Sequence, residues 1–148
     1  MGANKLLTSR VNYLTLLQFP FIFYLTAGVN DDKTIAIVDI EYKNEKLRKT
    51  CNESKVAIRE YGAENANKLR RRLDDVRAAS SLEIMRNLPG RCHELKGDRK
   101  GQLTLDLKHP LRLVFEACGP DVKNKEDGGL DWSSVKAVRI IGIEDTHE

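Results

Sequence analysis

The densest group of reactive side chains lies between residues 91 and 112 and combines imidazole with several cations. His93 and Lys96 fall in the polar segment 91–101, and Arg112 lies in the second of the two strand-like segments that follow, 111–115. An imidazole titrates near neutral pH and can carry protons, whereas lysine and arginine stabilise negative charge that develops on oxygen. The pattern indicates a site that grips a phosphate and performs acid–base chemistry on it.

The C-terminal residues supply further groups of the same kind. Asp145 and His147 end the last apolar segment of the chain. If that segment is a strand beside the Arg112 strand, a carboxylate and a second imidazole reach the same place. Asp145 would then act directly or orient an imidazole, and the assignment of acid and base among these groups stays open.

Neither a metal nor a cofactor is expected at this site. The cysteines Cys51, Cys92 and Cys118 are odd in number and lack a CxxC spacing, which argues against a disulfide framework or a zinc site. Too few carboxylates lie near the cluster to hold magnesium. Cys92 precedes His93 directly, but neighbouring strand residues point to opposite faces, so a cysteine nucleophile is not expected. Free thiols favour a reducing cytoplasm.

Periodicity predicts the elements that must position these groups. Helices are expected over 44–61, with a break near Asn52, and over 63–79, where an apolar stripe recurs at three- and four-residue steps. Ser80 and Glu83 resemble a capping box that starts a short helix. Strands are expected over 34–42, 102–107, 111–115 and 137–144. The order predicts an α+β domain with N-terminal helices packed on a small antiparallel sheet.

Two segments stand apart from this domain. Residues 1–37 form an N-terminal extension whose stretch 11–27 is nearly uncharged but interrupted by Pro20. It is a secretory signal or membrane anchor, an added element, or an over-extended start with the domain beginning at Val38; we expect residues 38–148 to be the domain, with no membrane partner. Residues 119–134 are polar and predict a long loop insertion.

Local charge matters more than the net charge of +3. Basic residues concentrate on the predicted helix at 68–77 and in the turn at 99–100. The plain interpretation is a solvated surface, and the functional one is contact with RNA phosphates. The candidate RNA-binding residues are Lys68, Arg71, Arg72, Arg99 and Lys100.

The order of motifs resembles a known family. A basic helix at 68–73 precedes the motif His-x-Leu-Lys-Gly-Asp-Arg at 93–99, which is followed by an alternating strand, the Arg112 strand and a terminal Asp-x-His at 145–147. This series resembles the HigB branch of the RelE/ParE toxin superfamily over about residues 39–147. The extension lies outside the resemblance.

The resemblance implies an endoribonuclease that enters the ribosomal A site and cuts mRNA there. It also implies a HigA-like antitoxin with a helix-turn-helix, and operator DNA contacted indirectly through that antitoxin. Carried over by position, the family's active-site residues correspond to His93, Lys96, Arg112, Asp145 and His147. Thr146 stands where the family often has tyrosine, which removes a stacking platform worth roughly 1–3 kcal/mol per base.

Three other functions compete with the ribonuclease. A ParE-type gyrase poison has the same fold, but it does not need the imidazole and cation set. A catalytically weak member would only bind the antitoxin and act as a co-repressor, which Thr146 leaves open. A basic RNA-binding module would bind RNA and leave it intact. The residue set favours the ribonuclease among these.

Overall fold

The computed structural model describes residues 37–146, all of which belong to the compact unit Ile35–Glu148. Except for Ile37, the predicted extension lies outside the described residues, as does the predicted catalytic residue His147. Within residues 37–146, no helix has both the length and the apolar character needed to cross a membrane.

A five-stranded sheet with the order β1-β5-β4-β3-β2 forms one layer of the domain. The strands are β1 Asp39–Tyr42, β2 His93–Glu94, β3 Gln102–Asp106, β4 Leu111–Cys118 and β5 Ala137–Asp145. The α+β class is confirmed, with one refinement: the sheet is mixed, because β1 runs parallel to β5. Helices separate β1 from the later strands in sequence, so its own residue pattern does not encode the direction of its neighbour.

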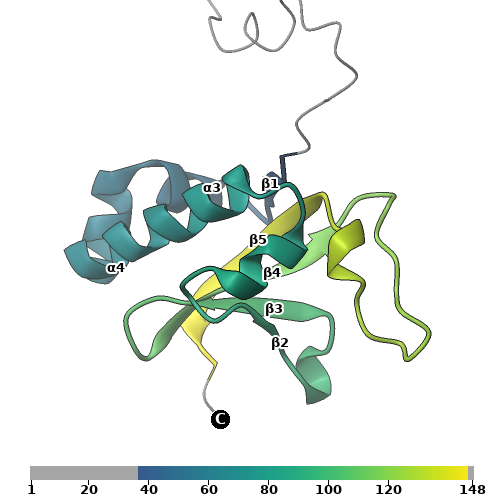
Figure 1. The fold of residues 1–148 in the computed structure, drawn as a ribbon. Helices are drawn as coiled ribbons and strands as arrows, with labels where there is room; N and C mark the ends of the chain where they lie inside the picture. Colours follow the sequence, from purple (N-terminus) through teal and green to yellow (C-terminus); the bar gives the residue numbers. More distant parts are fainter. Residues whose placement is uncertain (1–36, 147–148) are drawn as a thin grey trace, which may run out of the picture. The chain divides into compact units, whose positions relative to one another are not determined.

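Two helices form the second layer, on one side of the sheet (Figure 1). Helix α3 spans Glu45–Asn52, and Asn44 caps it by accepting a hydrogen bond from the Leu47 amide at 2.9 Å. Helix α4 spans Ser54–Ala78 and leaves helical geometry at Gly62, where φ is 79°. Because α3 ends at Asn52 and α4 begins at Ser54, the predicted break near Asn52 is confirmed. Gly62 marks a kink within α4.

The core lies between these layers. The predicted stripe of Ala66, Leu69, Leu73 and Val76 on α4 is buried. It belongs to the same hydrophobic cluster as the alternating residues of β3 and β4, among them Leu103, Leu105, Leu113 and Phe115. Burial of this face of the sheet directs the intervening residues of β3 and β4 to the opposite face.

The predicted capping box at Ser80 and Glu83 was wrong. The short element is a 3₁₀-helix, Leu82–Asn87, whose preceding residue Ser81 makes no capping bond through its side chain. The Leu82 amide instead donates to the Val135 carbonyl at 3.2 Å, and Glu83 pairs with Arg86 at 3.3 Å. A contact from the far end of the chain thus replaces the local cap.

The polar segment 119–134 connects β4 to β5. It contains an isolated bridge between Asn124 and Leu130 and a 3₁₀-turn, Trp132–Ser134. Trp132 is 1% exposed, lies under the Arg86 guanidinium, and donates from Nε1 to Glu94 at 2.6 Å. This bond ties the end of the loop to β2, directly beside His93. A further 3₁₀-turn, Gly97–Arg99, follows β2.

Candidate active site

Strand register brings two of the five predicted catalytic residues, His93 and Arg112, onto the face of the sheet that the helices do not cover. His93 is the register partner of Thr104, and Asp106 is the partner of Arg112. Thr104 and Asp106 alternate with the buried leucines of β3, so they share the outer face and lie about 7 Å apart along the strand. Four side chains from three strands therefore meet there.

Two hydrogen bonds fix the His93 ring. Nδ1 lies 2.7 Å from the Arg91 carbonyl oxygen, and Nε2 lies 3.3 Å from Thr104 Oγ1. A carbonyl can only accept, so Nδ1 carries the proton, and in the neutral ring Nε2 accepts from the Thr104 hydroxyl. Nε2 is consequently the nitrogen that can take up a proton.

Thr104 was missed by the sequence analysis. It is fully buried although it lies on the outer face. A threonine in a strand is ordinary, because β-branched residues are favoured there. The signal that finds it is the register that sets it opposite His93.

Arg112 is held in place before any ligand arrives. Its Nε donates to Asp106 Oδ1 at 3.0 Å, its Nη1 donates to Thr146 Oγ1 at 2.7 Å, and its side chain is only 14% exposed. Arg112 thus forms an ion pair with Asp106. It is compatible with phosphate binding, because an oriented cation costs little reorganisation.

A pocket of about 420 Å³ lies between the turn after β2 and the end of β5. Lys96, Asp145 and Thr146 contribute to its lining, and Thr146 joins it to Arg112. Arg99 also lines it, where it donates to Gln102 at 2.8 Å and pairs with Glu144. Lys96 and Asp145 therefore line the same pocket. Through its ion pair with Glu144, Arg99 attaches the turn after β2 to β5.

The other candidate RNA-binding residues are dispersed. Lys100 is exposed in the turn after Arg99. Lys68 and Arg71 lie on α4, in the layer on the opposite side of the sheet, where Lys68 pairs with Glu64 at 3.6 Å. Arg72 is 15% exposed, pairs with Asp75, and donates from Nε to the Asp106 carbonyl at 3.2 Å. Arg72 thus supports the backbone of β3 from the helical side.

Cys92 does not have the chemistry of a nucleophile. Burial raises the pKa of its thiol to about 12, far above the range in which a reactive thiolate forms. Across residues 37–146, no three His, Cys, Asp or Glu side chains gather closely enough to hold a metal ion.

Comparison with known proteins gives structural neighbours and no sequence relative. No family model and no curated protein matches the chain. The YoeB/ParE toxin from Agrobacterium tumefaciens is similar at 12% identity and a TM-score of 0.45, over 74% of this chain and 100% of that one. The YoeB-YefM complex from Staphylococcus aureus is similar at 14% identity and a TM-score of 0.44, over 75% and 98%. The YoeB dimer from Staphylococcus aureus is similar at 15% identity and a TM-score of 0.43, over 75% of this chain and 98% of that one. At these values the comparisons assign no residue and no activity.

Proposed function

We propose that this protein is the toxin of a type II toxin–antitoxin system and that it cleaves mRNA on the ribosome without a metal. The observation that carries the proposal is the oriented pair on the outer face of the sheet. His93 offers Nε2 for proton transfer. Arg112 lies on the same face, opposite Asp106, which is two residues after the His93 partner Thr104 on β3; Asp106 and Thr146 hold its guanidinium. The resemblance of the segment 93–99 to HigB toxins supports the same function.

The proposed reaction uses the ribose 2′-hydroxyl as the nucleophile. A base removes the hydroxyl proton, the oxygen attacks the adjacent phosphorus, and an acid protonates the leaving 5′-oxygen. His93 Nε2 is suited to one of these proton transfers, once Thr104 gives up its hydrogen bond to that nitrogen. Asp145 and His147 are the proposed candidates for the other transfer.

Cations would stabilise the phosphorane that forms during the attack. Arg112 and Lys96 are proposed to hold the scissile phosphate, Arg112 as a planar donor and Lys96 as an exposed point charge beside the neighbouring pocket. Removing a preorganised donor of this kind costs about 10²–10³ in rate in well-studied enzymes.

The proposed partners follow from the resemblance. They are a HigA-like helix-turn-helix antitoxin, the 70S ribosome with its mRNA, and operator DNA reached through the antitoxin, all in the cytoplasm. Arg99, Lys100, Lys68, Arg71 and Arg72 remain proposed RNA contacts. Since Arg72 and Arg99 already hold other parts of the protein, Lys100 and Arg71 are the more accessible members of that set.

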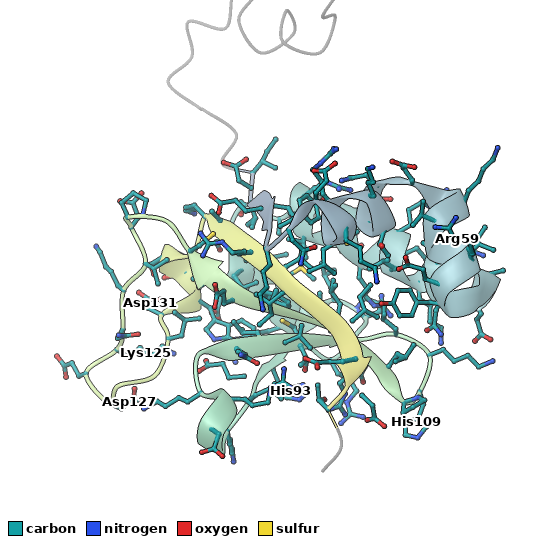
Figure 2. The ribbon with its side chains drawn as sticks, turned by 180° about the vertical axis from the view of Figure 1, so that it is seen from behind. Arg59, His93, His109, Lys125, Asp127 and Asp131 are labelled. Atoms are coloured by element: carbon teal, nitrogen blue, oxygen red, sulfur yellow. The ribbon has the colours of Figure 1, made fainter. Side chains whose placement is uncertain are left out.

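The test is primer extension on a reporter mRNA after induction of the full chain. New 5′ ends should arise within the reading frame and vanish when the start codon is removed. His93→Gln should lower cleavage by about 10²-fold or more, since it removes a proton-transfer group. Arg59→Gln is the matched control, because Arg59 lies on the helical layer, well apart from His93 (Figure 2).

Two other results would overturn the ribonuclease. Growth arrest with intact mRNA would favour a ParE-type gyrase poison. Absence of arrest, with the protein folded, would favour a member that only binds its antitoxin and acts as a co-repressor. The ion pair of Arg112 with Asp106 is the observation that fits such a member, because a neutralised arginine attracts phosphate less strongly.

A further inference from the structure

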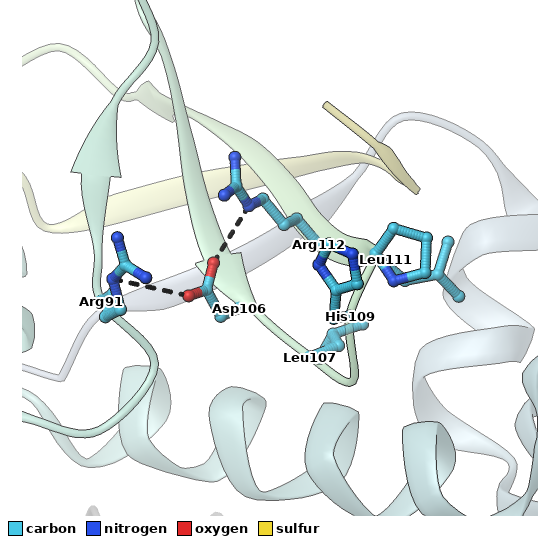
Figure 3. A pocket seen from close by; sticks show the side chains of 7 residues that line it. Arg91, Asp106, Leu107, His109, Leu111 and Arg112 are labelled. Carbon is cyan, nitrogen blue, oxygen red and sulfur yellow. Dashed lines mark hydrogen bonds and ion pairs between the residues drawn. The ribbon is translucent and has the colours of Figure 1, made fainter. Parts of the chain in front are cut away.

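A second, smaller hollow of about 170 Å³ lies beside the outer-face pair, between the segment before β2 and the turn from β3 to β4. Arg91, Asp106, His109 and Arg112 line its polar part (Figure 3). The two arginines approach different oxygens of one carboxylate: Arg112 Nε lies 3.0 Å from Asp106 Oδ1, and Arg91 Nε lies 3.7 Å from Oδ2. Figure 3 shows them on opposite sides of Asp106.

The Arg91 backbone has an uncommon conformation. Among residues 37–146 it is the one residue other than glycine with a positive φ, at 48°. Such a conformation is strained for a residue that carries a side chain, and it persists only where the surroundings impose it. Here the Arg91 carbonyl accepts from His93 Nδ1, and the preceding Gly90 carbonyl accepts from the Asp106 amide at 2.7 Å. One turn therefore positions the His93 ring and directs the Arg91 side chain to Asp106.

The charges of the hollow favour an anion. Among the side chains that line it, two guanidinium groups face one carboxylate. The Arg91 side chain is 81% exposed, in contrast to 14% for Arg112. Because Asp106 contacts Arg91 at Nε, the accessible end of this guanidinium can still donate paired hydrogen bonds to phosphate oxygens.

We propose that Arg91 binds an RNA backbone phosphate adjacent to the scissile one. This inference rests on the proposed function, because it takes its ligand to be the RNA that His93 and Arg112 act on. Arg112 and Lys96 hold the scissile phosphate, and Arg91, on the other side of Asp106, holds its neighbour in the chain. The contact is to phosphate, so it sets the position of the RNA and does not read its bases.

The test measures binding to a short single-stranded RNA with 2′-O-methyl riboses, which attack of a 2′-hydroxyl cannot cut. Affinity of the full-length protein is followed against salt concentration. Arg91→Asn removes the charge, while asparagine tolerates the left-handed backbone. Each phosphate contact to single-stranded nucleic acid contributes about 0.7 to the slope of log affinity against log salt. The magnitude of the slope should therefore decrease by about 0.7 in Arg91→Asn. It should stay at the wild-type value in Arg91→Lys, which keeps the charge.

Arg59→Asn is the matched control, since it removes an exposed arginine from the helical layer. Equal slopes for Arg91→Asn and Arg59→Asn would overturn the proposal. An equal decrease of the slope in Arg91→Asn and Arg91→Lys would also overturn it, because the effect would then come from the turn and not from the charge. Failure of the wild-type protein to bind the RNA would overturn it too.

Cleavage of mRNA on the ribosome is a separate measurement on the same variants. If the wild type binds the methylated RNA with a slope that depends on Arg91 but cuts no mRNA, the phosphate site stands and the ribonuclease does not. If it cuts mRNA while Arg91→Asn binds like Arg59→Asn, the ribonuclease stands and the phosphate site does not.

Discussion

At His93, two contacts decide which ring nitrogen is available for chemistry. The Arg91 carbonyl accepts a hydrogen bond from Nδ1–H, and the Thr104 hydroxyl donates to Nε2. An imidazole held at both nitrogens cannot rotate freely, so its available nitrogen has a defined direction. Nε2 lies against Thr104, on the face of the sheet that also carries Asp106 and Arg112.

The neutral His93 ring should therefore be the tautomer protonated at Nδ1. Nitrogen-15 NMR of the imidazole distinguishes the two forms by the shifts of the protonated and unprotonated nitrogens. Thr104→Val keeps the shape of the side chain and removes the hydroxyl, so the tautomer should persist because the carbonyl contact remains. Loss of ring orientation should lower mRNA cleavage by about tenfold, less than the ~10²–10⁴-fold that a general acid or base itself contributes. A ring protonated at Nε2 in the wild type would contradict the arrangement.

The thiols of Cys51 and Cys92 should react slowly in the folded protein. Burial raises the pKa of each to about 12, so the thiolate is scarce at pH 8. Titration with a thiol reagent should show both reacting far more slowly than in denaturant, where ordinary pKa values return. Cys92→Ala should retain mRNA cleavage.

The raised thiol pKa also makes the stability of the fold depend on pH. A thiol whose pKa is raised by folding favours the folded state below its unfolded pKa near 9, and this contribution is lost as pH rises toward 12. Rapid reaction of Cys92 at pH 8 in the native protein, or loss of cleavage in Cys92→Ala, would contradict the burial argument.

At the scale of elements, periodicity predicted those features of a helix or strand that depend only on its own residues. The stripe on α4 and the alternation of β3 and β4 are as expected, because each reflects one face turned to the core. The parallel pairing of β1 was not predictable from its own residues. Arg91 and Thr104 were missed as site residues for the same reason, since their roles depend on register and on a turn.

Two glycines of the chain offer a matched test of how the site is held. Gly62 and Gly90 both have positive φ, at 79° and 113°. A Cβ on Gly62 would meet nothing within 4 Å, whereas one on Gly90 would lie 2.5 Å from Arg72 Nε. Gly62→Ala should therefore cost backbone strain alone, about 1–3 kcal/mol.

Gly90→Ala should cost more, because Arg72 must also leave its hydrogen bond to the Asp106 carbonyl. Urea unfolding of the two variants measures the difference in free energy. Since Gly90 directly precedes Arg91, Gly90→Ala should also lower cleavage more than Gly62→Ala does. Equal stabilities would show that Arg72 moves aside without consequence.

At the scale of the whole molecule, the described domain contains its own core. The cluster of buried apolar residues runs from Val38 to Ile143. Val38 is 1% exposed, and its amide donates to the Ala79 carbonyl at 3.0 Å; the Asp39 amide donates to the Lys136 carbonyl at 2.9 Å. These contacts attach β1 to both layers, so the first strand is part of the fold.

A chain of residues 35–148 should consequently unfold with nearly the free energy of the full chain, within about 1 kcal/mol, which is small beside the stability of a typical domain. Trp132, the single tryptophan of the sequence, is buried and reports on this domain by its fluorescence during urea unfolding. The matched control begins at Lys43 and lacks β1. It loses the Val38 and Ile40 side chains and the pairing with β5, and removing a buried aliphatic residue alone costs about 2–5 kcal/mol. If deletion of residues 1–34 destabilised the protein as much as deletion of β1, the extension would have to contribute to the core, and the domain boundary near Val38 would be wrong.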